Sequence, residues 1–369
     1  MPPLTVMIKP VSGACNMRCQ YCFYADEMVH RSVAVYPPMT QEMLSLIVRR
    51  CMMFADLEVS FAFQGGEPTL AGLDYYRELI RQERQYNTRG LRVNNLIQTN
   101  GYDISDEMIR FFAEEQFLVG LSMDGTEQAH DAHRRDAKGD GTYGRVLNCA
   151  RRMEEAGVRF NILCVVNHQT AMQSRKILSE LKRYRYIQFI PCIEPIENRY
   201  VEYALKPEEW GGFLIEAYDE YERAFRIGKP LHIRHFDNWM DMLMGVPPED
   251  CSMSGQCQPH FVFESNGDVY PCDFYMTDAW KMGNIADSSL RSLLKSPVVD
   301  AFCRTSRAVP ETCHACEWYA LCRNGCRKDR AEDGLCRWCT SNKMFFEQRG
   351  KRMKELAMAI WKREAYARR

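Results

Sequence analysis

The sequence predicts an α/β protein in which a partial barrel of about six βα units precedes a small cysteine-rich domain and a C-terminal helix. Two observations lead to this prediction. Between residues 4 and 190, short apolar β-rich runs alternate with amphipathic stretches of helical period. From residue 251 the chain changes to loop-like sequence that holds ten of its 17 cysteines.

Six runs of the first part are predicted strands, because β-branched and aromatic residues dominate them. They are TVMIKPV at residues 5–11, EVSFAF at 58–63, NNLIQT at 94–99, FLVGLSM at 117–123, RFNILCVV at 159–166 and IQFIPCI at 187–193. The predicted helices between them cover residues 40–55, 73–86, 105–115, 143–157 and 170–184. Helical connections make neighbouring strands parallel, which places functional residues at the carboxyl ends of the strands.

The remaining elements complete three predicted segments. A connecting helix at residues 206–228 lies near the end of a first domain of residues 1–235. Loops and cysteines fill residues 236–345, where an Asn-Gly pair at residues 266–267 predicts the turn of a hairpin. Residues 346–369 are predicted to form a basic helical tail whose charges face solvent.

The composition excludes several function classes. The formal net charge is −1, so no overall field favours nucleic acid or an anionic membrane. No apolar run reaches the roughly 18 residues of a membrane span, and the first residues lack the pattern of a secretory signal. We therefore expect a cytoplasmic protein, whose reducing surroundings disfavour a disulfide framework. Four scattered cysteines are expected to be core residues: Cys51, Cys149, Cys164 and Cys192.

The first cysteine motif, GACNMRCQYCFY, contains Cys15, Cys19 and Cys22 directly after the first predicted strand. Three thiolates can hold three irons of a 4Fe–4S cluster and leave the fourth iron open to a small molecule. An open coordination position distinguishes a catalytic metal centre from a structural one. A partial zinc site is the alternative that this spacing leaves open.

This motif resembles that of the radical S-adenosylmethionine (SAM) superfamily, including Tyr21 before its last cysteine. The resemblance implies that SAM binds the open iron and is cleaved to a 5′-deoxyadenosyl radical. The stretch FQGGEPTL, after the second predicted strand, matches the superfamily segment that contacts the SAM amino group. In this sequence that segment is Gly65, Gly66 and Glu67.

Further contacts with SAM follow from the same resemblance. Ser122 and Arg134 are implied to meet the ribose and carboxylate of SAM, and Ile193 to lie near its adenine. Two histidines close to Arg134, His130 and His133, could be taken for a metal-binding pair. Their polar sequence context instead predicts that both are exposed on the surface.

The late cysteines form a second motif, which includes the run CHACEWYALCRNGC. Its spacing fits either a pair of zinc sites or two fully ligated iron–sulfur clusters. It resembles the auxiliary-cluster domain called SPASM, found in radical SAM enzymes that modify peptides. That resemblance implies two auxiliary 4Fe–4S clusters, and hence three clusters in all. The implied ligands are Cys251, Cys257, Cys272 and Cys326 for one cluster, and Cys313, Cys316, Cys322 and Cys339 for the other, with Cys336 as a competitor for the last position.

Four stretches narrow the resemblance further: FAFQGGEPTLAG, FLVGLSMDG, FNILCVV and VYPCDFY. Together they resemble the anaerobic sulfatase-maturating enzymes, which oxidise a cysteine or serine of a sulfatase polypeptide to Cα-formylglycine. The resemblance implies a base close to the target residue, for which Asp273 is the candidate. It also implies that Gln64 and Tyr24 line the substrate pocket, and that an external donor such as flavodoxin or ferredoxin supplies electrons.

Two other functions compete with this interpretation. A SPASM-type radical SAM enzyme that forms thioether or carbon–carbon crosslinks in a ribosomal peptide would share all the implied cluster ligands. A zinc-stabilised binding protein would share only the cysteines. An aldehyde product would distinguish sulfatase maturation from crosslinking of a ribosomal peptide. Bound iron with sulfide would distinguish it from a zinc-stabilised binding protein. The sequence leaves open whether the target residue is cysteine or serine.

Overall fold

The computed structural model describes residues 3–197 and 201–367, apart from the side chains of residues 363–367. Its strands form one open sheet in the order β10-β9-β8-β1-β2-β3-β4-β5-β6-β7. They are β1 (Leu4–Ile8), β2 (Glu58–Phe63), β3 (Arg92–Thr99), β4 (Leu118–Ser122), β5 (Arg159–Val166), β6 (Tyr186–Pro191), β7 (His232–Ile233), β8 (Phe261–Phe263), β9 (Asp268–Tyr270) and β10 (Gly283–Asn284). The six predicted strands are confirmed as β1 to β6, and each pairs in parallel with the next.

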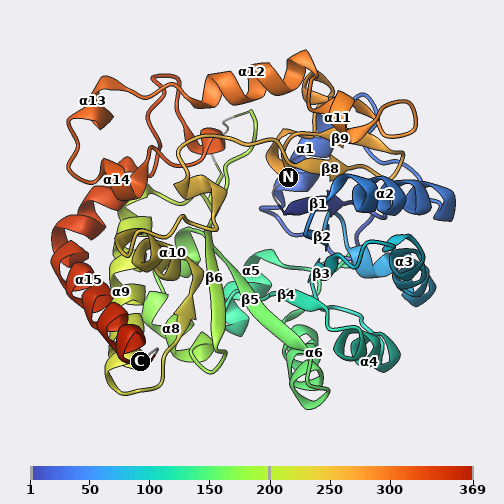
Figure 1. Cartoon of the computed structure of the whole chain (residues 1–369). Helices are drawn as coiled ribbons and strands as arrows, with labels where there is room; N and C mark the ends of the chain where they lie inside the picture. The colour runs from blue at the N-terminus through green and yellow to red at the C-terminus, as the bar shows by residue number, and fades with distance from the viewer. Residues whose placement is uncertain (1–2, 198–200, 368–369) are drawn as a thin grey trace.

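Helices flank this curved sheet, with α2, α3, α4 and α6 along its outer side (Figure 1). They are α1 (Phe23–Val29), α2 (Gln41–Phe54), α3 (Leu73–Tyr86), α4 (Asp106–Glu114), α5 (Glu127–His133), α6 (Tyr143–Glu155), α7 (His168–Ala171), α8 (Ser174–Leu181), α9 (Pro207–Arg226), α10 (Arg234–Leu243), α11 (Leu290–Leu293), α12 (Pro297–Ser306), α13 (Glu311–His314), α14 (Tyr319–Cys322) and α15 (Cys339–Ala367). The predicted helices of the first part of the chain are confirmed, except that the stretch of residues 170–184 is divided between α7 and α8. Within the described ranges, no helix combines the length and apolarity of a membrane span.

Local sequence explains where these helices begin and which face they bury. The hydroxyls of Thr40 and Ser105 accept hydrogen bonds of 3.2 Å from backbone N–H groups in the first turns of α2 and α4. Apolar residues then recur at helical spacing, and the buried side of α2 contains Leu44, Ile47 and Cys51. The four scattered cysteines predicted to be core residues are all buried.

The cysteine-rich segment continues the barrel sheet. β1 pairs in parallel with β2 on one side (Ile8 with Phe63) and with β8 on the other (Ile8 with Phe263). β8 and β9 form the predicted antiparallel hairpin, and Gly267 takes a φ of +87° at its turn. One hydrophobic core therefore includes residues from both parts of the chain.

The C-terminal helix is longer and more deeply packed than predicted. α15 begins at Cys339, ahead of the predicted start at residue 346, and runs along α9 (Figure 1). Arg349 and Arg352 form ion pairs of 2.8 and 2.9 Å with Asp219 of α9. The expectation that the basic charges of the tail face only solvent is therefore wrong, because α9 offers carboxylates along the line of contact.

We expect Phe345→Ala to destabilise the protein, because Phe345 of α15 is fully buried. Its ring stacks on Trp239 and Phe236 at centroid distances of 4.8 and 5.7 Å. The cavity left by this substitution should lower the free energy of unfolding by about 3–5 kcal/mol, measured by anaerobic chemical denaturation. Met358→Ala is the control, since Met358 is exposed on the same helix and its loss should cost at most about 0.5 kcal/mol. Equal losses in both variants would contradict this packing.

Candidate active site

The first cysteine loop follows the carboxyl end of β1, as predicted. Burial raises the pKa of Cys15 to about 11 and that of Cys19 to about 12, and the charges of neighbouring thiols in the loop add to both shifts. Cys22 caps α1, where its Sγ accepts the N–H of Ala25 at 3.4 Å. Buried thiols this close together become thiolates only beside a compensating positive charge, so the donor set fits iron.

The Gly65-Gly66-Glu67 loop packs directly against the first cysteine loop. Gly65 and Gly66 take φ angles of +94° and +50°, which glycine adopts without strain. A Cβ on Gly66 would lie 2.1 Å from the carbonyl oxygen of Ala14, which accepts the N–H of Glu67 at 2.8 Å. The two predicted motifs are therefore adjacent, as one SAM-binding site requires.

The Glu67 carboxylate is buried and held by hydrogen bonds. Its Oε1 accepts the N–H and hydroxyl of Thr69 (3.0 and 2.7 Å) and the hydroxyl of Thr99 (2.8 Å). Its Oε2 accepts the N–H of Asn100 at 2.7 Å. Burial raises the pKa of Glu67, although these hydrogen bonds oppose the shift. A carboxylate oxygen has two lone pairs, so Oε2 has capacity for a further donor such as an ammonium group.

Arg134 is bound to a carboxylate that the sequence did not single out. Its Nε lies 2.9 Å from Oδ2 of Asp124, just beyond β4, and the hydroxyl of Tyr21 donates to the same oxygen. Burial opposes ionisation of Asp124, but Arg134 holds the pKa of this carboxyl below its usual value. Ser122 is buried at the end of β4, and Ile193 is half-buried just after β6. Ser122, Asp124 and Ile193 lie at or just beyond the carboxyl ends of strands, and Arg134 follows α5.

The prediction that His130 and His133 are exposed is wrong. Both are buried, because α5 packs against α6 and the first cysteine loop: the His130 ring lies 5.6 Å from that of Tyr143, and the His133 ring 5.7 Å from that of Tyr21. His130 accepts the N–H of Asp124 at Nδ1 (3.3 Å), and burial lowers its pKa to about 4. His133 hydrogen-bonds to Gln20 and Gln169 (2.7 and 2.6 Å), so the two imidazoles serve separate polar contacts.

The structure gathers the first predicted auxiliary ligand set from distant parts of the chain. Cys251 begins η2 (Cys251–Met253), Cys272 follows β9, and Cys326 precedes η5 (Arg327–Asp329). Burial raises the pKa of Cys272, and the charges of Cys251 and Cys257 add to that shift. Burial also raises the pKa of Cys326, and the charges of Cys272 and Cys251 add to that shift. Four thiols within electrostatic reach of one another fit an iron–sulfur cluster.

The second predicted ligand set surrounds a cavity of about 130 Å³. The cysteines that line this cavity are Cys313, Cys316, Cys322, Cys336 and Cys339. Burial raises the pKa of Cys313. This shift is increased by the charges of three neighbouring thiols, Cys322, Cys339 and Cys316. Cys336, the competing ligand, is buried, and its N–H donates to Oδ1 of Asn324 at 2.9 Å.

The candidate base Asp273 lies close to α1, which directly follows the first cysteine loop: the ring of its neighbour Phe274 is 4.9 Å from that of Phe23. Asp273 begins η3 (Asp273–Tyr275), and its Oδ1 is 2.5 Å from Nζ of Lys9 at the carboxyl end of β1. Gln64 is half-buried directly after β2. Tyr24 of α1 is buried, and its hydroxyl donates to Oε2 of Glu264 at 2.8 Å.

Comparison with known proteins agrees with this arrangement. A family model described as "Radical SAM superfamily" matches residues 10–181, and one described as "Iron-sulfur cluster-binding domain" matches residues 251–317. A cysteine-type anaerobic sulfatase-maturating enzyme from Clostridium perfringens (strain 13 / Type A) is 40% identical over 356 residues, covering 94% of this chain and 96% of that protein. The chain belongs to the anaerobic sulfatase-maturating enzymes. A serine-type member from Bacteroides thetaiotaomicron is 30% identical and covers 94% of this chain and 89% of its own.

Solved structures place this sulfatase-maturating enzyme among its relatives. The structure "Native anSMEcpe with bound AdoMet and Cp18Cys peptide" matches with a TM-score of 0.93 and 38% identity, covering 97% of this chain and all of the other. Streptococcus suis SuiB bound to precursor peptide SuiA matches with a TM-score of 0.64 and 16% identity, covering 92% of this chain and 76% of the other. The second likeness concerns the fold alone.

Four polar residues of this maturating enzyme were missed by the sequence interpretation: Lys9, Asn100, Asp124 and Glu264. Each lies at or just beyond the carboxyl end of a strand and bonds to a predicted site residue or its neighbour. Asn100, for example, joins the Glu67 carboxylate to the side chain of Asn16 in the cysteine loop (2.8 Å). For Asn100, Asp124 and Glu264 the available signal was a polar residue directly after an apolar run, whereas Lys9 lies inside its run.

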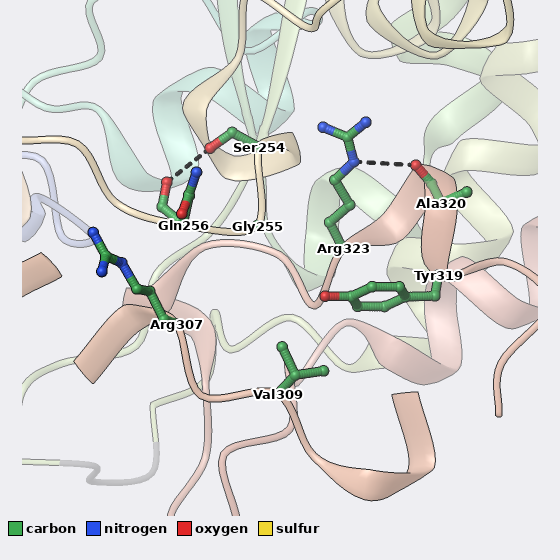
Figure 2. A pocket seen from close by; sticks show the side chains of 8 residues that line it. All are labelled: Ser254, Gly255, Gln256, Arg307, Val309, Tyr319, Ala320 and Arg323. Carbon is green, nitrogen blue, oxygen red and sulfur yellow. Dashed lines mark hydrogen bonds between the residues drawn. The ribbon is translucent and has the colours of Figure 1, made fainter. Parts of the chain in front are cut away.

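A larger cavity of the enzyme, about 480 Å³, lies in the auxiliary domain (Figure 2). One wall consists of residues 254–256, between Cys251 and Cys257, and another contains Tyr319 and Arg323 on either side of Cys322. The Nε of Arg323 donates to the carbonyl of Ala320 at 3.2 Å, which fixes the guanidinium at the rim. This cavity therefore lies beside loops that contain cysteines of both predicted auxiliary ligand sets.

We expect Gly66→Ala to weaken SAM binding at least about 10-fold, equivalent to about 1.4 kcal/mol. A Cβ at this position requires the Ala14 and Gly66 loops to separate, and the positive φ adds strain of about 1–2 kcal/mol. Gly72→Ala is the matched control, since Gly72 also has a positive φ (+83°) but an added Cβ meets no atom within 4 Å. Anaerobic calorimetric titration with SAM measures both variants, and equal affinities would show that this close approach is unimportant.

Proposed function

We propose that this enzyme oxidises a cysteine of a sulfatase polypeptide to Cα-formylglycine. The observation that carries the proposal is that Asp273 lies beside the first cysteine motif. Its Oδ1 is 2.5 Å from Nζ of Lys9, which directly follows β1, and the ring of its neighbour Phe274 is 4.9 Å from that of Phe23, directly after Cys22. Preference for cysteine over serine is supported by identities of 40% to cysteine-type relatives and 30% or 28% to serine-type ones.

We infer that three 4Fe–4S clusters and SAM are the cofactors. Cys15, Cys19 and Cys22 would hold the SAM-binding cluster, with the Gly65-Gly66-Glu67 loop beside it. When bound, these cofactors supply the radical that removes the Cβ hydrogen of the target, and an acceptor for the second electron of the oxidation. The two auxiliary ligand sets remain as implied by the resemblance, with Cys339 as the last ligand.

The residues of this chain carry the proton chemistry and the positioning. Asp273 would accept the thiol proton of the target cysteine, and its place next to Cys272 brings that base beside an auxiliary site. Gln64, after β2, would orient the target side chain. Tyr24 would serve the pocket through its ring, because its hydroxyl is committed to Glu264. Water then replaces sulfur at the oxidised carbon and releases sulfide.

The proposal also includes an electron donor and a cellular location. An external one-electron carrier such as flavodoxin or ferredoxin would reduce the SAM-binding cluster. We propose a cytoplasmic location, because the spacing of the two cysteine motifs is that of metal ligands, which a reducing compartment favours over disulfides.

Removal of single cysteines tests the second auxiliary ligand set. Cys339→Ala should lower bound iron by about four atoms per chain after anaerobic reconstitution, because the auxiliary cluster would lose one of the four thiolates that hold it. Cys336→Ala is the matched control from the same cavity and should retain its iron and sulfide. The opposite order of iron contents would assign the ligand to Cys336.

Anaerobic turnover with two peptides tests the function itself. The peptides share a sulfatase sequence and carry cysteine or serine at the target position. Wild-type enzyme with SAM and reductant should form a hydrazine-reactive aldehyde faster on the cysteine peptide. Asp273→Asn should continue to produce 5′-deoxyadenosine but lower the aldehyde yield by about 100-fold or more, since a positioned base contributes that much. Aldehyde at the wild-type rate from this variant would exclude Asp273 as the base, and a crosslinked product without aldehyde would exclude the function.

A further inference from the structure

We propose that Lys9 is the positioning residue of Asp273: its buried ammonium fixes the direction of that carboxylate toward the target cysteine. The inference rests on the proposed function, because it assumes that Asp273 serves the oxidation. It adds a role for a residue in the first strand run, which the sequence interpretation treated only as part of a strand.

Lys9 lies where the barrel and the auxiliary segment meet. It directly follows β1, and its backbone N–H donates to the carbonyl of Phe263 in β8 at 2.9 Å. On the other side of β1, the N–H of Gln64 donates to the carbonyl of Ile8 at 3.1 Å. The side chain of Lys9 has no solvent-exposed surface. Lysine is almost never fully buried without a partner, because removing an ammonium from water is costly.

The buried ammonium has two partners. Its Nζ lies 2.5 Å from Oδ1 of Asp273 and 4.1 Å from the centroid of the Tyr24 ring. The ring face offers a negative potential to the cation, so Tyr24 and Asp273 together replace the water that Lys9 has lost. The Asp273 side chain is itself only 11% exposed, which means that its orientation depends on this ion pair.

The surroundings leave Lys9 little freedom to move. A Cβ on Gly65 would lie 2.5 Å from Cδ of Lys9, so the absent side chain of this glycine makes room for the lysine stem. The hydroxyl of Tyr24 is held by Glu264, whose Oε2 also pairs with Arg31 at 2.8 Å. Lys9 thus bridges the glycine loop of the SAM site and the candidate base of the substrate site.

A second buried carboxyl makes the position of this cation important. Glu27 of α1 is buried, and its Oε2 has no hydrogen-bond partner among the described residues. Burial raises the pKa of Glu27 to about 8, Asp273 adds to the shift, and Lys9 opposes it. Lys328 and Arg31 also oppose the shift of Glu27, but Lys9 is the cation that pairs with Asp273, so without Lys9 the Asp273 carboxylate would turn away from Glu27.

The test measures aldehyde formed per 5′-deoxyadenosine released in Lys9→Met, a variant of nearly equal volume. We expect this ratio to fall at least about 10-fold, because small misplacement of a reacting group costs up to about 100-fold. In an Asp273→Asn background, Lys9→Met should change the ratio by no more than about twofold, since two residues that act as one unit are not additive. A merely structural lysine would not produce this dependence on Asp273.

Two further variants keep the test decisive. The ratio counts aldehyde per SAM cleaved, so a smaller fraction of folded enzyme does not change it. If Lys9→Met releases no 5′-deoxyadenosine, Lys9→Gln takes its place. Lys281→Met is the control, because it breaks a lysine–aspartate pair of 2.8 Å with Asp268 in the same domain. The inference is overturned if the Lys9 variants retain the wild-type ratio of aldehyde to 5′-deoxyadenosine. It is also overturned if a Lys9 substitution lowers this ratio as much in the Asp273→Asn background as in the wild-type enzyme. Absence of aldehyde from the wild-type enzyme would instead overturn the proposed function.

Discussion

The parallel pairing of β1 with both β2 and β8 is the constraint on which the rest of this structure depends. It joins residues from opposite ends of the chain, Ile8 with Phe63 and with Phe263. Because of this pairing, the auxiliary segment extends the barrel sheet. The turn after β9 then brings Asp273 within 2.5 Å of Lys9 at the end of β1, which sets the candidate base beside the first cysteine motif.

Buried charges stabilise this edge in pairs drawn from different elements. Asp124 beyond β4 binds Arg134 after α5, and Glu264 beyond β8 binds Arg31 after α1. Loss of one partner from such a pair leaves an uncompensated buried charge and costs about 3–5 kcal/mol. These pairs therefore specify how the loops at the carboxyl ends of the strands are arranged, more than they add to net stability.

The cysteine sites couple folding to metal. Burial raises the pKa of Cys19 and of Cys272, and neighbouring thiols add to both shifts, so without iron these two retain their protons. Metal ligands must be deprotonated, which means that cluster assembly releases protons and draws the cysteine loops together. The cavity bounded by Cys313 and Cys339 is shaped by a short helix and the start of α15, whose other residues pack on α9. Loss of a cluster is therefore expected to loosen the loops more than the barrel.

The sequence by itself determined the strands, the helices between them and the spacing of both cysteine motifs, because these depend on local periodicity and on residue types with few chemical roles. It also determined the family, since the motifs at the strand ends are specific. Only the tertiary structure decided that His130 is buried, that α15 begins at Cys339 and pairs with Asp219, and that Lys9 contacts Asp273. The reason is physical: burial and ion pairing depend on which distant segments meet, and hydrogen-bonding periodicity along one segment carries no information about its partner.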